Sequence, residues 1–208
     1  MNRFTMKQLE LMLEAQAGLN VKYTGENWAN IVPMSSFAAA TMAELGELLE
    51  SSPRIGDNEA GWKWWKPYLE NDDNNVKVEI IDIIHFTLSM LIMAYETPAE
   101  VIEVYKNNAL DVFAPDEPRK MEYMLGAVSG FVVNSSSLDY HSFIIDFTYM
   151  IDSLCHFNGM STDEMFEIYA KKNALNAERI AGGYTKDANS YEKYDKDGNE
   201  DNTKMFKD

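Results

Sequence analysis

The chain of 208 residues is long enough for one large domain with a buried core. Hydrophobic residues make up 46% of it, which excludes a disordered composition, and a single cysteine excludes an intramolecular disulfide framework and a cysteine-only metal site. The formal net charge of −16 argues against a nucleic-acid-binding surface, so an anionic substrate such as a phosphate would need clustered cations or metal ions.

The sequence also argues against a signal peptide and a membrane-spanning segment. Its start, MNRFTMKQLELMLEAQ, is amphipathic and lacks the apolar core of a signal peptide. The longest apolar segment, at about 80–95, is interrupted by Asp82 and His85, so we expect it to be too polar to span a bilayer. We therefore expect a soluble cytoplasmic protein without a nucleic-acid or membrane partner.

Helical periodicity dominates the chain and predicts one all-α domain over 1–208. The predicted helices cover 4–20, 35–51, 76–95, 97–113, 119–133, 139–157 and 161–184. Their expected N-terminal caps are Thr5, Ser35 or Ser36, Thr97 before Pro98, and Ser161 or Thr162. Residues 54–75 are predicted to be a loop because Gly, Pro and Asx residues surround three tryptophans there, and the polar tail of 185–208 is predicted to be irregular.

The chain carries an internal repeat at a shift of 64 residues. Segment 80–110 aligns with 144–175 with one insertion. A two-helix unit duplicated once explains this most simply, and it predicts two similar halves packed as one helical bundle. Glu79 corresponds to Phe143, so only the first copy carries the Glu-x-x-Asp pair, whereas the second copy is richer in cations and amides.

Two predicted helices carry rows of carboxylates. Glu44 and Glu47 are three residues apart and so share a helix face, as do Glu79 and Asp82. If the two rows face each other, their oxygens suit a hard divalent cation such as Mg²⁺ or Mn²⁺. For the first row a solvated helix face is the favoured alternative. The second row lies among isoleucines, where an unpaired carboxylate is costly, so we expect a metal or a buried ion pair.

The cations of this acidic protein gather near the end of the last predicted helix. Lys172, Asn176 and Arg179 fall at i, i+4 and i+7, on one helical face, with Tyr184 and Lys186 after them. An arginine can bind two phosphate oxygens at once and a lysine adds a point charge, so the cluster favours a phosphate site. The alternative is an ordinary basic C-terminal turn that complements the helix dipole.

The loop sequence GWKWWKP concentrates aromatic side chains. It places Trp62, Trp64 and Trp65 beside two lysines. Such a cluster could close over a planar base, but from the residues alone a packed corner of the core is favoured.

Seven stretches in order resemble one known family. They are LELMLEAQAGLN, ENW, AELGELLES, WKWWK, VEIIDIIHFTLS, KNALNAERIAGGY and GNEDN. In this order they resemble the dimeric all-α dUTPases, relatives of the MazG-like nucleoside triphosphate pyrophosphatases, over roughly 9–96 and 163–202. The resemblance implies a MazG-like helical architecture, a homodimer, and hydrolysis of dUTP to dUMP and pyrophosphate with Mg²⁺, for which Mn²⁺ could substitute.

The same resemblance implies roles for individual residues. The expected metal ligands are Glu44, Glu47, Glu79 and Asp82, and Glu47 is also the acid expected to orient the attacking water. Gln16 and Asn20 match positions that read the uracil edge, with Trp62 and Trp65 in the enclosing loop and Phe86 beside the deoxyribose. The expected phosphate ligands are Lys172, Asn176, Arg179, Tyr184 and Lys186, with Asn202 near the same end. The role of His85 is open, and Thr185 interrupts the family pattern, which leaves both Lys186 and Lys193 as candidates.

Two alternatives stay open at this point. A related enzyme could accept dCTP as well as dUTP, because a side-chain amide can flip donor for acceptor. A protein of another class, an acidic non-catalytic helical interaction protein, would also fit the composition, although the focused cation cluster argues against it.

Overall fold

The computed structural model describes residues 2–54, 61–67, 69–108, 120–135, 140–183 and 201–206. Within these ranges the chain forms helices and no strand, which confirms the predicted all-α fold. The elements are α1 (Met6–Thr24), α2 (Trp28–Ile31), α3 (Met34–Ser51), α4 (Asp73–Tyr95), α5 (Pro98–Asn108), α6 (Lys120–Asn134), α7 (Tyr140–Asn158), α8 (Thr162–Ala181) and the 3₁₀-helix η1 (Asp201–Phe206).

Three of the predicted helix caps are confirmed. The Thr5 hydroxyl accepts from the Gln8 backbone N–H at 3.2 Å, and the Gln8 side chain accepts from the Thr5 N–H at 2.8 Å, which makes a capping box. The Ser161 hydroxyl accepts from the N–H of residue 164 at 3.1 Å, and Thr97 makes the same contact with residue 100 at 3.3 Å. These bonds satisfy N–H groups that a helix start leaves without partners.

Several helix boundaries differ from the prediction. Helix α4 begins at Asp73, inside the segment of 54–75 that was predicted to be a loop. Helix α3 begins directly after Pro33, which has extended backbone angles and no side-chain cap, so the predicted cap at Ser35 or Ser36 is wrong. Helix α1 runs on to Thr24 and ends at Gly25, whose φ of 97° is open to glycine. Helix α8 ends at Ala181, before the predicted residue 184, because two glycines of low helix propensity follow.

Two short elements were not predicted. Helix α2 has four residues, and η1 lies inside the tail that was expected to be irregular, so that expectation is wrong for residues 201–206. Neither is longer than about two turns, and a hydrophobic periodicity cannot be recognised in so short a sequence.

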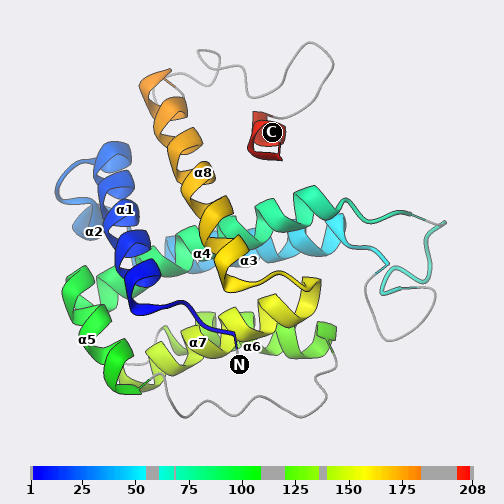
Figure 1. Cartoon of the computed structure of the whole chain (residues 1–208), viewed down its shortest axis with the longest axis horizontal. Helices are drawn as coiled ribbons and strands as arrows, with labels where there is room; N and C mark the ends of the chain where they lie inside the picture. Colours follow the sequence, from blue (N-terminus) through cyan, green and yellow to red (C-terminus); the bar gives the residue numbers. More distant parts are fainter. Residues whose placement is uncertain are drawn as a thin grey trace.

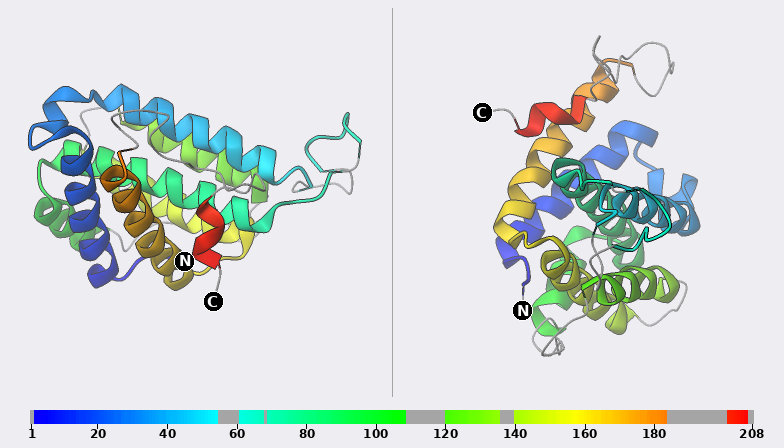
Figure 2. Two further views of the ribbon diagram at one scale, coloured as in Figure 1. Left: turned by 90° about the horizontal axis from the view of Figure 1, so that it is seen from above. Right: turned by 90° about the vertical axis from the view of Figure 1, so that its right-hand side faces the viewer.

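The helices pack as crossed pairs. Figure 1 shows α3 and α4 lying side by side, α6 and α7 forming a second pair, and α1 and α8 crossing over α4. The predicted repeat units correspond to α4 with α5 and α7 with α8, each two helices joined by a short turn. The loop after α3 projects at the far end of the α3–α4 pair, as Figure 2 shows. Helix α4 contacts α1, α3, α5, α7 and α8, so it is the helix against which most others pack.

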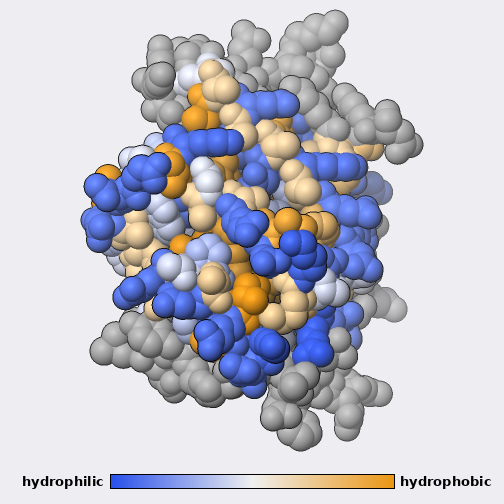
Figure 3. Space-filling view, turned by 60° about the vertical axis from the view of Figure 1, so that its left-hand side comes forward, coloured by the Kyte–Doolittle hydropathy of each residue, from blue (hydrophilic) through white to orange (hydrophobic). Residues whose placement is uncertain are grey.

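Helix α4 forms the centre of the core. Its residues Ile80, Ile81, Ile83 and Ile84 are fully buried. By length and a mean hydropathy of 1.6 this helix could cross a membrane, contrary to the sequence-based expectation, but 78% of that window is buried inside the bundle. Burial of this extent is the environment of a core helix. On the face shown in Figure 3, hydrophilic side chains predominate, with smaller apolar areas between them.

Candidate active site

A cavity of about 500 Å³ opens between α1, α3, α4 and α8. It brings together predicted residues from every motif except the tryptophan loop. The predicted residues that line it are Gln16, Asn20, Glu44, Glu47, Glu79, Asp82, Phe86, Lys172, Asn176, Arg179 and Asn202. His85, whose role was open, lines it too. Tyr184, Lys186 and Lys193 lie outside the described residues.

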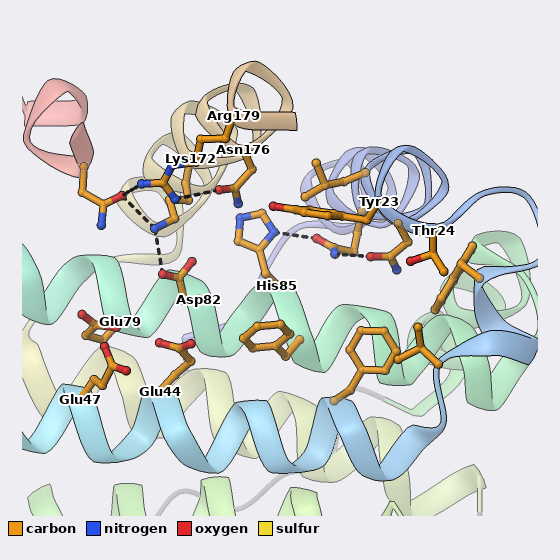
Figure 4. Close-up of a pocket in the computed structure, with 18 residues that line it drawn as sticks. Tyr23, Thr24, Glu44, Glu47, Glu79, Asp82, His85, Lys172, Asn176 and Arg179 are labelled. Carbon is orange, nitrogen blue, oxygen red and sulfur yellow. Dashed lines mark hydrogen bonds and ion pairs between the residues drawn. The ribbon is translucent and has the colours of Figure 1, made fainter. Parts of the chain in front are cut away.

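The carboxylates converge at one end of the cavity. Glu44 and Glu47 extend from α3 toward Glu79 and Asp82 of α4 (Figure 4). Ligand atoms of Glu44, Glu79 and Asp82 all lie within 4.8 Å of one another, while Glu47 lines the cavity outside this group. Glu44 is half-buried and Glu47 exposed. Glu50, the next acid of the row, points elsewhere and pairs with Lys63.

Crowding changes the proton affinity of these acids. Burial, a hydrogen bond with Glu44 and the nearby charge of Asp82 raise the pKa of Glu79 to about 9. Burial, and then the charge of Asp82, also raise the pKa of Glu44. Glu79 is 5% exposed and accepts a hydrogen bond from the Asn75 amide at 2.9 Å. The buried charge anticipated at Glu79 is therefore relieved by a proton in the metal-free protein.

The acid group fits a hard divalent cation. Its potential ligands are carboxylate oxygens on two packed helices, the donor set that Mg²⁺ and Mn²⁺ prefer. A cation beside three carboxyl groups would favour their charged forms and so oppose the effect of crowding. Glu44, Glu79 and Asp82 are the residues able to hold such an ion.

The cations of α8 lie beside the acids, at the same end of the cavity. Lys172 is 3% exposed, and its Nζ lies 2.8 Å from Asp82 Oδ2 and 2.9 Å from Asn202 Oδ1. Arg179 is 7% exposed and donates from Nη1 to Asn176 Oδ1 at 3.2 Å. Lys172, Asn176 and Arg179 thus share one face of α8, as their spacing predicted, and that face is turned into the cavity (Figure 4).

The 3₁₀-helix η1 fixes the arginine. Arg179 Nε donates to Asp201 Oδ2 at 3.2 Å, and its Nη2 contacts Asp201 Oδ1 and donates to Asn202 Oδ1 at 3.0 Å. Asp201 and Asn202 are both 6% exposed. Two residues of the C-terminal segment therefore complete the cation side of the cavity.

A chain of polar contacts occupies the opposite end. The Gln16 and Asn20 side chains are 3% and 6% exposed and contact each other, with Gln16 Nε2 3.0 Å from Asn20 Oδ1. His85 Nδ1 lies 2.6 Å from Gln16 Oε1, and Tyr169 donates to the same oxygen at 3.1 Å. The His85 ring stacks on Tyr169 with centroids 4.4 Å apart. Burial, and then the charge of Lys172, lower the pKa of His85 to about 3, so the ring is neutral.

Aromatic side chains form an apolar wall between the two ends. The rings of Trp28 and Phe37 meet edge to face at 5.9 Å, and Phe37 lies 6.4 Å from Phe86. All three residues line the cavity. The wall offers an apolar surface suited to a planar ring or a sugar.

The tryptophan loop stands apart from the cavity. Trp62 Nε1 donates to the Leu49 carbonyl at 3.0 Å, and its ring meets that of Trp65 edge to face at 5.8 Å. Trp64 is 73% exposed and Trp65 55%. The structure does not bring Trp62 or Trp65 together with the other predicted site residues, because the loop packs on the end of α3.

Several residues in or beside the cavity were not predicted from the sequence. Phe37 lies in the predicted helix of 35–51 without a distinguishing pattern, and Asp201, which holds Arg179 but does not line the cavity, lies in the tail expected to be irregular. Trp28 occurs within ENW, one of the stretches that resemble the family, so its place at the site could have been predicted from that resemblance. Tyr169 corresponds to Tyr105 in the other copy of the repeat, an identity that indicates duplication and not a role at the site.

An all-helical bundle whose cavity holds carboxylates beside cations at one end and amides at the other is suited to bind a nucleotide. A family model described as dUTPase matches residues 8–184, and the chain belongs to this all-α dUTPase family. The protein is therefore a dUTPase-like nucleotide hydrolase, and the resemblance identified in the sequence is confirmed. Among curated protein sequences, none matches this chain.

Proposed function

We propose that this protein hydrolyses dUTP to dUMP and pyrophosphate in a Mg²⁺-dependent reaction and so limits uracil incorporation into DNA. The observation that carries the proposal is the order of groups along the cavity. Carboxylates and cations stand at one end, an aromatic wall in the middle and neutral amides at the other end. This order suits a nucleotide whose triphosphate, sugar and base lie in that sequence, and about 500 Å³ is within the usual size of ligand pockets.

In the proposed complex, the neutral end binds the base. Asn20 reads its polar edge, supported by Gln16. Phe86 packs beside the deoxyribose, where an apolar ring leaves little room for an additional hydroxyl group. A neutral His85 adds no charge at this end of the cavity.

The charged end binds the triphosphate. Lys172 and Arg179 neutralise phosphate oxygens, and Asn176 donates from its amide. Glu44, Glu79 and Asp82 hold the metal. When bound, Mg²⁺ supplies further charge neutralisation at the phosphates and makes a water more acidic.

The residues of the chain then serve an in-line displacement. The attacking water forms a bond to the α-phosphorus, the bond from that phosphorus to the bridging oxygen breaks, and pyrophosphate leaves with the electron pair. Glu47 lines the cavity next to the metal ligands and is exposed, so we assign to it the orientation of the water and acceptance of its proton. Lys172 and Arg179 stabilise the charge on the departing pyrophosphate.

Membership of the family also supports a homodimer working in the cytoplasm, with Mn²⁺ able to replace Mg²⁺. Light scattering coupled to gel filtration tests the first point, and a mass of one chain would contradict it. Replacing Mg²⁺ by Mn²⁺ in the activity assay tests the last.

The experiment that tests the function is pyrophosphate release from a panel of ribo- and deoxyribonucleoside triphosphates, each with Mg²⁺ and with excess chelator. We expect dUTP to be hydrolysed fastest and the chelator to abolish turnover. Metal-dependent turnover of a different nucleotide in preference to dUTP would correct the substrate. Absence of turnover with every nucleotide would overturn the proposal and revive the non-catalytic interaction protein.

A further inference from the structure

Ser89 connects the two amides at the neutral end of the cavity. It lies on α4 one turn after His85 and is fully buried. Its Oγ is 3.0 Å from Gln16 Nε2, 3.0 Å from Asn20 Nδ2 and 3.1 Å from the His85 carbonyl oxygen, and Asn20 Oδ1 lies farther away, at 3.4 Å. A single hydroxyl thus contacts both residues that face the base.

The hydrogen bonds that the Ser89 hydroxyl can make determine how the side-chain amides of Gln16 and Asn20 are oriented. A serine hydroxyl donates one hydrogen bond and accepts two. The His85 carbonyl can only accept, so it takes the Ser89 proton, and both amides must then direct N–H groups at Ser89. If both amides were reversed, the single proton of the Ser89 hydroxyl would face three acceptor oxygens, those of the two amides and of the His85 carbonyl. With one amide reversed, Gln16 and Asn20 would oppose two oxygens or two N–H groups. Each alternative leaves buried polar atoms unpaired, which is costly.

Gln16 has no remaining donor for a ligand. Its two N–H groups go to Asn20 Oδ1 and Ser89 Oγ, both at 3.0 Å. Its carbonyl oxygen contacts His85 Nδ1 at 2.6 Å and the Tyr169 hydroxyl at 3.1 Å, and it shares the single proton of that hydroxyl with the Met12 carbonyl oxygen at 3.0 Å. Gln16 therefore acts on the base indirectly, by holding Asn20.

The orientation of the Gln16 amide also determines which ring nitrogen of His85 carries the proton. Because Gln16 Oε1 is an acceptor, the proton of neutral His85 lies on Nδ1. Its Nε2 is then an acceptor, fully buried and without a hydrogen-bond partner among the described residues, in a side chain that lines the cavity. Asn20 directs one N–H at Ser89, which leaves its second N–H as a donor at the cavity wall.

We propose that Ser89 is a positioning residue that sets the base preference: by locking both amides, it makes Asn20 present a donor, which selects a base with a carbonyl group at the recognised position. This inference rests on the proposed function. Uracil carries a carbonyl at position 4, where cytosine carries an amino group. The amino group of cytosine opposite the Asn20 N–H would place two hydrogen-bond donors together in a buried site. This mismatch discriminates strongly against cytosine. The amides cannot flip to accommodate cytosine while Ser89 holds them.

The test measures kcat/KM for dUTP, dCTP and dTTP in the wild type and in Ser89→Ala. Removing the hydroxyl frees the amides to reverse, so the dUTP-to-dCTP ratio is expected to fall by about tenfold or more. The dUTP-to-dTTP ratio is expected to stay unchanged, because thymine has the same carbonyl and differs by a methyl group. A loss of stability alone would lower all three values together and leave both ratios intact.

Ser153→Ala is the matched control. Ser153 is also fully buried and donates to the carbonyl four residues back, that of Tyr149 at 2.7 Å, but unlike Ser89 it contacts neither Gln16 nor Asn20. Both substrate ratios are expected to match the wild type in this variant. If Ser89→Ala does not fold, Asn20→Asp replaces the donor by an acceptor and is expected to move the dUTP-to-dCTP ratio in the same direction.

The possible outcomes separate this inference from the proposed function. Wild-type protein that hydrolyses dUTP and dCTP equally, or a Ser89→Ala ratio equal to that of the wild type, overturns the role of Ser89 and leaves the hydrolase intact. No turnover of any nucleotide by the wild type overturns both. A selective fall of the dUTP-to-dCTP ratio supports both.

Discussion

Lys172 Nζ lies 2.8 Å from Asp82 Oδ2, and this ion pair joins α8 to α4 inside the cavity. The lysine side chain is 3% exposed and the aspartate side chain 19%, so water screens the pair only weakly. The acid row and the cation row are thus coupled before any ligand binds. An anion that draws Lys172 away from Asp82 leaves that carboxylate available to a metal ion.

Replacing Lys172 by methionine is expected to destabilise the metal-free protein by about 3 kcal/mol, because it leaves Asp82 in a partly buried site without its cation. Added Mg²⁺ should recover part of the loss, and turnover should fall at least about a hundredfold. Chemical unfolding with chelator and with Mg²⁺ provides the measurement. Lys77→Met is the control: Lys77 joins the same two helices through Glu164 at 2.6 Å but outside the cavity, where both side chains are partly exposed to water, so its loss should cost only about 0.5 kcal/mol. Equal losses for the two variants would contradict this account.

Glu79→Gln is expected to abolish turnover while the helical circular-dichroism signal persists. Glutamine resembles the protonated carboxyl that Glu79 carries in the metal-free protein, with its pKa near 9, so folding should be little affected. Metal binding needs the charged form, which glutamine cannot supply. Pyrophosphate release and Mg²⁺ calorimetry measure the effect, with exposed Glu50→Gln as control. Activity above a few per cent of wild type would sink the metal-ligand assignment.

Stability of the metal-free protein should fall as pH rises from about 5 to about 9. The folded pKa of Glu79, about 9, exceeds its ordinary value of 4.5, so the folded state binds more protons than the unfolded state across this window. The stabilisation is complete below the lower value and is lost as pH rises through the higher one. Mg²⁺ should therefore raise Tm more at about pH 9 than at about pH 6. A Mg²⁺ effect that is independent of pH in thermal melts would refute the linkage.

His85 should destabilise the protein in acid. Its folded pKa, about 3, lies below its ordinary value of 6.5, so the folded state binds fewer protons between these values and stability is lost as pH falls through the window. The contribution is at most about 1.4 kcal/mol per pH unit. Urea unfolding of wild type and His85→Gln between about pH 6.5 and pH 4 should show a smaller slope in the variant. Parallel slopes would mean that the ring is already charged in the folded protein.

The long helices of the fold could be predicted because their apolar positions recur over several turns. Helix α4 is the clearest example, with isoleucines that are fully buried on either side of Asp82. The short elements could not be predicted in this way. The 3₁₀-helix η1 is held by contacts of Asp201 and Asn202 with α8, residues that lie more than twenty positions away in the sequence.

The two sides of the charged end could be predicted because helical spacing puts Glu79 with Asp82, and Lys172 with Arg179, on single faces. The neutral end was harder. Ser89 and Tyr169 look like ordinary core residues in the sequence, and their polar roles exist only through Gln16, which is 73 and 153 positions away. A hydrogen-bond network of distant residues has no local pattern to reveal it.

The cavity draws on residues as far apart in the sequence as Gln16 and Asn202. During synthesis the bundle helices can pack as they emerge, with the N-terminal ones first. The clamp on Arg179, in contrast, must wait for Asp201 and Asn202. The cation side of the cavity is therefore completed only after α1 to α8 have been synthesised.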